Sequence, residues 1–319
     1  MTGGRTGRRK RGRMELAAAA ALIVAAAVCR GVTEQELHEL FDARRIPVDE
    51  AALRSGALEG MIRAVDRRAR ILTSGDIASW TNRTPAVAAE AWPEGILYVK
   101  LDGLYPGSGE ALTASLGGIE AEPPNGVIVD LRAAGGDHID AVTHIAGRFV
   151  EPGRFLYEVT DGRGEVVERC HAPTNALPPG RSPLAVLVSG ETRGAGEVLA
   201  GVLGRLDRSI VIGSRTSGHE GLMERIPLSE DRQLLVTTRW VSLGSNSVAL
   251  QEGLLPDIEV SETAEGAGPL AIPGKQREGK PLSEKARMDR RLMERVSTDP
   301  ALRRATDILL GLHALGAVR

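Results

Sequence analysis

Apolar runs separated by glycine turns form the most regular part of the chain, between residues 184 and 221. Residues 184–190 read LAVLVSG, which is typical of a strand buried on both faces. Apolar positions 198, 199, 202 and 203 then repeat at helical spacing, and a second buried strand follows at residues 209–213. Strand, glycine turn, helix and strand predict a βαβ crossover, with functional loops after the carboxyl ends of its strands.

The patterns before this crossover predict helices and then further strands. Thr33 and Glu36 form a capping box that opens a helix, and Pro47 separates it from a second helical segment that runs to Leu72. Residues 95–104 and the run VIVDLR at 127–132 have the composition of buried strands. A helix is expected between them at residues 110–116.

After the crossover, residues 236–241 predict a strand followed by a hairpin-like turn at 244–246. Two C-terminal helices are expected, and Asp299-Pro300 is a typical start signal for the last one. We divide the chain into 1–31 (signal peptide or membrane anchor), 32–80 (helical segment), 81–94 (linker), 95–262 (core), 263–282 (linker) and 283–319 (C-terminal helices).

The N-terminus has the pattern of an export segment. Six basic residues precede the apolar run at residues 16–28. This run is shorter than the roughly 20 residues that a membrane-spanning helix needs, and it suits the core of a signal peptide. An uncleaved membrane anchor or a lipid-modified Cys29 are the alternatives. We therefore expect an exported protein, either periplasmic or anchored on the outer side of the inner membrane, with residues 16–28 as the membrane-associated part.

Composition narrows the classes of function. The 319 residues are 42% hydrophobic, so the chain can bury a sizeable core, and the net charge of −2 gives no reason to propose nucleic acid as a partner. Cys29 and Cys170 form neither a disulfide framework nor a CxxC pattern, and Cys170 is interpreted as a surface or half-buried thiol rather than a catalytic one. The histidines at 138, 144 and 171 lack ligand spacing, so neither a metal nor a cofactor is expected.

Two strings around the crossover carry a resemblance. TRGAGE at residues 192–197 and TSGHEGLM at 216–223 resemble the C-terminal processing (tail-specific) serine peptidases, whose motifs read S-A-S-A-S-E and T-x-G-K-G-x-x-Q. VIVDLR and GLLPDIEV, at residues 253–260, resemble further strings of that family. The resemblance implies an α/β fold, with a ClpP/crotonase-like core of βαβ units and flanking N- and C-terminal helices.

The resemblance also identifies the site positions. An ungapped alignment places Gly194 at the serine nucleophile, His219 at the lysine base and Met223 at the glutamine that orients the base. Gly136 and Ala195 are the oxyanion-hole equivalents, and Asp137 replaces a glycine of that turn. The segment between residues 73 and 94 is too short for the PDZ domain that grips substrate tails in the family.

These replacements predict an inactive relative, because glycine has no side chain with which to form an acyl-enzyme. The leading hypothesis is a pseudoprotease that binds protein or peptide tails or is a scaffold within a homo- or hetero-oligomer. The alternative is an active serine-type endopeptidase in which Thr192 is a displaced nucleophile and His219 its base. A dinucleotide cradle at residues 194–196 is disfavoured, because Leu199 takes the place of the last glycine. Asp130 and Arg132 are interpreted as a structural ion pair.

Overall fold

The computed structural model describes residues 33–81, 83–117, 123–174, 182–219, 221–244, 252–261 and 292–316. The predictions for residues 1–31 and for the linker 263–282 lie outside these ranges. The chain divides into two compact units, residues 1–61 and 62–319. Among the described residues, none of the helices has both the length and the apolar character needed to cross a membrane.

The first unit contains α2 (Glu34–Arg44) and most of α3 (Glu50–Val65). The predicted capping box is confirmed, since the Thr33 hydroxyl accepts from the Glu36 N–H at 3.2 Å and the Glu36 carboxylate accepts from the Thr33 N–H at 2.8 Å. These hydrogen bonds lower the pKa of Glu36. The chain leaves α2 through Arg45 in a left-handed conformation, and Pro47 follows, as the sequence indicated.

The prediction that the second helical segment runs to Leu72 is wrong at its C-terminal end. Residues Arg70–Thr73 form strand β1, which pairs antiparallel with β10 (Arg232–Ser242). The Asp66 carboxylate, just after α3, accepts hydrogen bonds from the N–H groups of Arg68 and Thr237, both at 2.9 Å. A partner strand far along the chain therefore overrides the helical tendency of this segment.

The linker predicted at 81–94 is also wrong in part. After α4 (Ser74–Thr81), residues Val87–Ala91 form strand β2 and Pro93–Gly95 form the short helix η1. β2 is an edge strand, antiparallel to β3 (Ile96–Leu101). Trp92 is buried and its ring stacks on that of Tyr98 at 4.6 Å between centroids. The strand was not predicted because its alanines, on a partly exposed edge, lack the alternation of large apolar and polar residues that is typical of a strand.

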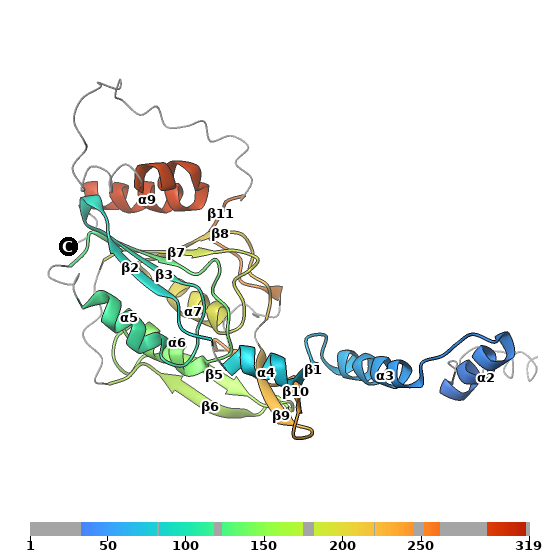
Figure 1. Ribbon diagram of the computed structural model, residues 1–319. Coiled ribbons are helices and arrows are strands. Elements are labelled where there is room, and N and C mark those ends of the chain that lie inside the picture. Colours follow the sequence, from blue (N-terminus) through green and yellow to red (C-terminus); the bar gives the residue numbers. More distant parts are fainter. Residues whose placement is uncertain are drawn as a thin grey trace, which may run out of the picture. The chain divides into compact units, whose positions relative to one another are not determined.

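The core is a six-stranded sheet in the order β11-β8-β7-β4-β3-β2, parallel except for β2. Its remaining strands are β4 (Gly126–Asp130), β7 (Leu184–Val188), β8 (Ser209–Gly213) and β11 (Ile258–Glu259). Helices α5 (Ser108–Leu116), α6 (Ile139–Ala146) and α7 (Ala195–Gly204) cover one face, and α9 (Pro300–Ala314) covers the other (Figure 1). The predicted α/β class and the βαβ crossover are confirmed.

Both faces of the sheet are buried, as the apolar runs predicted. On β7, Ala185 and Leu187 pack toward α9, whereas Leu184, Val186 and Val188 pack toward α7. Asp299 caps α9 by accepting from the Leu302 N–H at 3.0 Å, which confirms the predicted start of that helix. Residues 292–298 are helical as well, and the rest of the penultimate predicted helix lies outside the described ranges.

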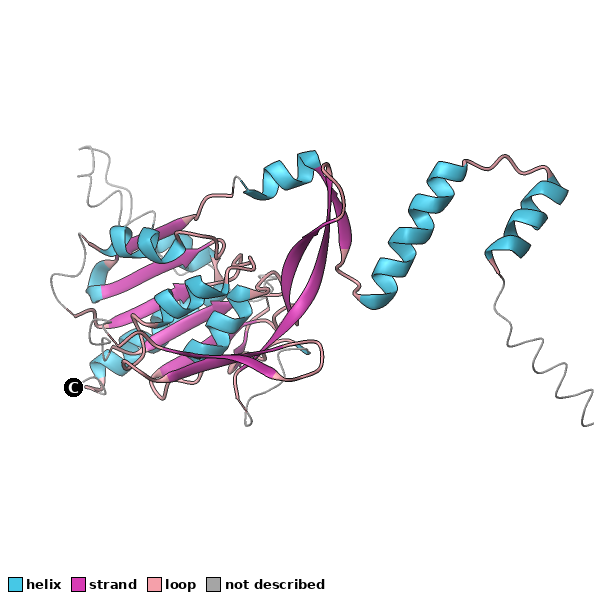
Figure 2. Ribbon diagram, turned by 90° about the horizontal axis from the view of Figure 1, so that it is seen from below, coloured by secondary structure: helices cyan, strands magenta, loops and turns pink. Residues whose placement is uncertain are grey.

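A second, antiparallel sheet packs beyond α6 and α7. It contains β1, β10, β5 (Phe155–Thr160) and β6 (Val166–His171), and β9 (Gly221–Pro227) pairs with β10. Figure 2 shows the strands of the large sheet side by side, with helices along them. Apolar residues of β5 join the core formed by α6 and α7. The predicted turn at 244–246 lies mostly outside the described ranges.

Candidate active site

The turn between β7 and α7 places Gly194 at the N-cap of α7 with φ 57° and ψ −126°. This backbone conformation is rare for residues with a side chain. A Cβ built on Gly194 would lie 2.5 Å from the carbonyl oxygen of Gly136, where ordinary contacts exceed 3 Å. Any side chain at the position that resembles the family nucleophile therefore requires the 135–137 turn to move.

The oxyanion-hole equivalents contact each other. The Ala195 N–H donates to the Gly136 carbonyl at 2.9 Å, so the amide that would face a developing oxyanion is already hydrogen-bonded. Gly136 has φ 109°, and a Cβ there would lie 2.3 Å from the Leu104 carbonyl oxygen. The turn is consequently packed from both sides and closed over the N-terminus of α7.

Asp137 faces the position of the missing side chain. Its Oδ1 lies 3.7 Å from the Cβ position of Gly194. Burial raises the pKa of Asp137, while the charges of Arg68, Arg83 and Arg193 act to lower it. A carboxylate here opposes a developing oxyanion, so Asp137 points in the direction that disfavours acyl transfer.

Glu197 fixes the loop after β8 against α7. The carboxylate is fully buried, and it accepts hydrogen bonds from the N–H groups of Gly218 at 2.7 Å and His219 at 2.6 Å. The Thr216 hydroxyl donates to it at 2.5 Å and the Gly194 N–H at 3.3 Å. The sequence indicated only a favourable charge at the start of a helix, and this loop-binding role emerged from the structure.

His219 is thus held at the site by its backbone. The imidazole is half-buried, and burial with the charges of Arg68 and Arg193 lowers the pKa of His219 against the opposing effects of Glu197 and Asp66. A neutral imidazole is chemically able to accept a proton. Gly194 has no hydroxyl from which the imidazole of His219 could accept a proton.

Thr192 is fully buried in the same turn. Its hydroxyl donates to the Leu131 carbonyl at 2.8 Å and accepts from the Ser189 N–H at 2.9 Å. Both bonds stabilise the turn, and within the described parts of the chain none joins the hydroxyl to His219. The Ser189 hydroxyl similarly donates to the Arg132 carbonyl at 2.8 Å.

Met223 lies on β9, at the position that resembles the family's orienting glutamine. The side chain is half-buried and lines a cavity of about 530 Å³ together with Asp137. A thioether cannot donate a hydrogen bond to a base. The structure therefore brings together all the positions named from the sequence, and none of them forms a nucleophile–base pair.

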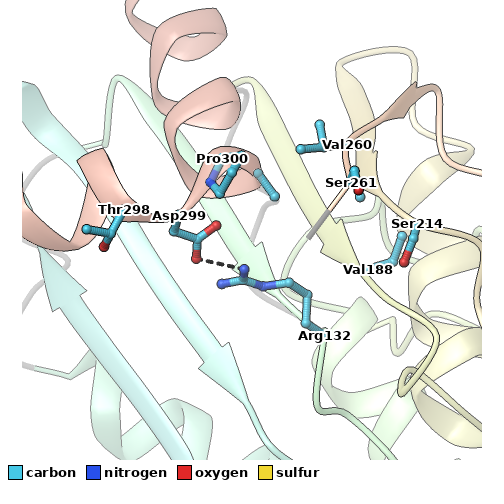
Figure 3. Close-up of a pocket in the computed structure, with 10 residues that line it drawn as sticks. Arg132, Val188, Ser214, Val260, Ser261, Thr298, Asp299 and Pro300 are labelled. Carbon is cyan, nitrogen blue, oxygen red and sulfur yellow. Dashed lines mark ion pairs between the residues drawn. The ribbon is translucent and has the colours of Figure 1, made fainter. Parts of the chain in front are cut away.

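Asp130 and Arg132 form the ion pair that the sequence indicated. Arg132 Nη2 lies 2.7 Å from the buried Asp130 carboxylate, and Arg132 Nη1 lies 2.7 Å from Asp299 at the start of α9. Burial alone would raise the pKa of Asp130, but the hydrogen bonds and charge of Arg132 bring it below its ordinary value. Figure 3 shows the Arg132–Asp299 pair in a cavity of about 280 Å³ between the sheet and α9.

Cys170 is a buried thiol on β6, and burial raises its pKa to about 11. Its Sγ donates to Glu168 Oε1 at 3.2 Å, whereas the neighbouring His171 is exposed on the opposite face. The alternation confirms that the two residues do not form a pair. The sequence predicted a surface or half-buried thiol, and the structure buries it instead.

An α/β core with a strand–turn–helix site of this kind is the frame of a serine peptidase of the C-terminal processing type. The model of peptidase family S41 matches residues 95–260, and the chain belongs to that family. The carboxy-terminal-processing protease of Bartonella bacilliformis is 29% identical over 156 residues, which cover 47% of this chain and 35% of that protein. The chloroplastic C-terminal processing peptidase of Tetradesmus obliquus is 27% identical over 179 residues, covering 54% and 38%.

This chain thus matches between 35% and 38% of the length of these two curated relatives. Among solved structures, a lipoprotein from Streptococcus agalactiae has a TM-score of 0.53 at 19% identity, covering 76% of this chain and 90% of that one. A protein from Parabacteroides merdae has a TM-score of 0.51 at 19% identity, covering 72% and 82%. These likenesses establish the fold.

Proposed function

We propose that this member of family S41 lacks serine-peptidase chemistry and binds peptide segments in the groove beside its former nucleophile turn. The observation that carries the proposal is Gly194, whose Cβ position lies 2.5 Å from one carbonyl oxygen and 3.7 Å from the Asp137 carboxylate. Removing the nucleophile of a serine protease costs about six decades in turnover, or about 8 kcal/mol of transition-state stabilisation.

The alternative nucleophile, Thr192, has little in its favour. A serine-type nucleophile needs a hydroxyl that faces both substrate and base. The Thr192 hydroxyl is buried and donates to the Leu131 carbonyl, so attack on a substrate would require breaking the turn that holds α7. Peptide binding without cleavage is the better-supported function.

We also propose that the protein is exported and that its ligands are protein or peptide tails. The basic residues and the apolar run at 16–28 support export, with the chain periplasmic or anchored on the outer side of the inner membrane. Names of relatives such as the carboxy-terminal-processing protease of Bartonella bacilliformis support protein tails as ligands. Binding in a homo- or hetero-oligomer is compatible with a scaffold role.

The test measures cleavage of an unstructured protein and of peptides with apolar C-termini by the full chain. Wild type is expected to release no fragments above the rate in buffer, and Thr192→Ala is expected to behave identically. Cleavage by wild type that Thr192→Ala abolishes would overturn the proposal and identify a displaced nucleophile.

A set of revertants tests why the site is inactive. Gly194→Ser with His219→Lys restores two reacting groups but leaves the Asp137 carboxylate beside them, so we expect at most weak cleavage. Adding Asp137→Gly removes the opposing charge and loosens the turn. We expect cleavage to rise further in this triple variant.

A further inference from the structure

Strand β2 is one edge of the large sheet, and its backbone groups face two ways (Figure 1). The Asp102 N–H donates to the Ala86 carbonyl at 3.1 Å, and the Trp92 N–H donates to the Ile96 carbonyl at 2.7 Å. In an antiparallel pair the bonded residues alternate, so the even-numbered residues of β2 face β3. The residues whose N–H and C=O groups point outward are Val87, Ala89 and Ala91.

This outer edge is open and regular. Among the described residues, no hydrogen bond reaches the outward N–H and C=O groups. Native proteins commonly blunt such edges with lysine, proline or a bulge, because an open edge is a template for another strand. The strand VAAEA contains neither lysine nor proline, and its register with β3 is unbroken. The edge of β2 is therefore able to pair with a further strand.

The edge is complementary to itself. A two-fold axis through Ala89, normal to the sheet, sets Val87 of one copy opposite Ala91 of a second copy in an antiparallel pair. All three outward residues of each copy then exchange hydrogen bonds, six in all. A shift by one residue sets an outward residue opposite Pro85 or Pro93, which have no N–H. The flanking prolines thus favour the register centred on Ala89.

The side chains on the α5 face match in this register. Val87 and Ala89 are partly buried and pack against the core, and Val99 of β3 lies opposite Ala89. Across the axis, Ala89 meets Ala89 of the second copy, with Val99 of each copy beyond it. The row that crosses the two sheets on this face is apolar throughout.

The α9 face brings no like charges directly opposite each other. Here Glu90 of one copy lies opposite Ala88 of the other, and Lys100 lies beyond Ala88 on β3. Each charge already has a partner in its own chain, since Lys100 pairs with Asp102 at 2.8 Å and Glu90 pairs with Arg295 at 3.3 Å. Pairing two copies therefore opposes a carboxylate to a methyl group, without charge repulsion.

We infer that β2 pairs antiparallel with β2 of a second copy of this chain, so that two large sheets join into one across a two-fold axis. The occupant is a second copy because the hydrogen-bonding groups, the flanking prolines and both faces fit the strand's own sequence in one register. A contact of five residues is small, so we expect a dimer that dissociates at roughly micromolar concentration. The inference is independent of the proposed function, since it uses none of the residues at the Gly194 turn.

The experiment measures sedimentation velocity of the full chain from about 1 to 100 µM, with Ala91→Pro as the first variant. Ala91 is exposed and its N–H points outward, so proline removes no hydrogen bond to β3. It removes one donor from each copy and places a ring on the edge, and we expect dimerisation to weaken at least about tenfold. Circular dichroism checks that the variant folds as wild type does.

Ala88→Glu tests the register without touching the backbone. The new carboxylate lies opposite Glu90 of the second copy, and Ala88→Gln is the matched control of equal size. We expect Ala88→Glu to dimerise about threefold to tenfold more weakly than Ala88→Gln, with the difference shrinking at high ionic strength. Adding Glu90→Gln to Ala88→Glu is expected to restore dimerisation.

Val167→Glu distinguishes the two sheet edges. Val167 is 56% exposed on β6, which is an edge of the other sheet, and this variant is expected to dimerise like wild type. A wild type that stays monomeric throughout the range overturns the inference and leaves the β2 edge to an extended peptide. Dimers that Ala91→Pro and Ala88→Glu leave unchanged, or that Val167→Glu weakens equally, also overturn it.

Discussion

Gly194→Ala tests whether the turn at the position that resembles the family nucleophile is closed. The new Cβ would lie 2.5 Å from the Gly136 carbonyl oxygen, and the residue would adopt φ 57°, ψ −126°. A strained backbone of this kind costs about 1–3 kcal/mol, and overpacking of a buried site costs about the same again. Together we expect about 2–6 kcal/mol of lost stability, or roughly 4–24 °C in Tm for a unit of this size.

The assay is thermal and urea unfolding followed by circular dichroism, with Gly164→Ala as the matched control. Gly164 has φ 79° but no atom within 4 Å of a built Cβ, so its substitution reports the backbone cost alone, about 1–2 kcal/mol. The difference between the two variants measures the contact with Gly136 together with the extra backbone cost of ψ −126° at Gly194. If Gly194→Ala costs no more than Gly164→Ala, the Gly136 carbonyl moves freely and the argument for a closed site is refuted.

The remaining predictions concern two carboxylates. Arg132→Met leaves the buried Asp130 unpaired and should cost about 3–5 kcal/mol at pH 7, whereas Arg169→Met breaks the exposed pair with Glu158 and should cost less than about 1 kcal/mol. The folded-state pKa of Asp130 lies below 3.8, so its ionised form stabilises the fold above that pH and this stabilisation is lost on further acidification. The free energies of unfolding of wild type and Arg132→Met, measured against pH, should therefore converge in acid. Asp137 has the opposite shift, so it destabilises the fold increasingly as pH rises above 3.8, and Asp137→Asn should raise Tm at pH 7 but not at pH 3. An equal effect of Asp137→Asn at both pH values would contradict the burial of its charge.

Local pattern determined much of the large sheet and its helices. Continuous apolar runs predicted β7 and β8, and Asp299-Pro300 predicted the start of α9, because strand burial and helix capping are set within a few residues. The resemblance to tail-specific peptidases added the family and the alignment of Gly194, His219 and Met223. The prediction failed at β1, whose partner strand β10 lies far along the chain, and at β2, whose alanines on an exposed edge carry little strand pattern although its partner β3 follows directly.

The state of the site depends on distances between segments far apart in the chain. The sequence by itself established that Gly194 has no nucleophilic side chain. Tertiary structure alone decided that the Ala195 amide donates to Gly136, that Asp137 faces the empty position, and that Thr192 is buried. Each of these results comes from the packing of the β4–α6 turn against the start of α7, which no local pattern encodes because sheet order brings those two turns together.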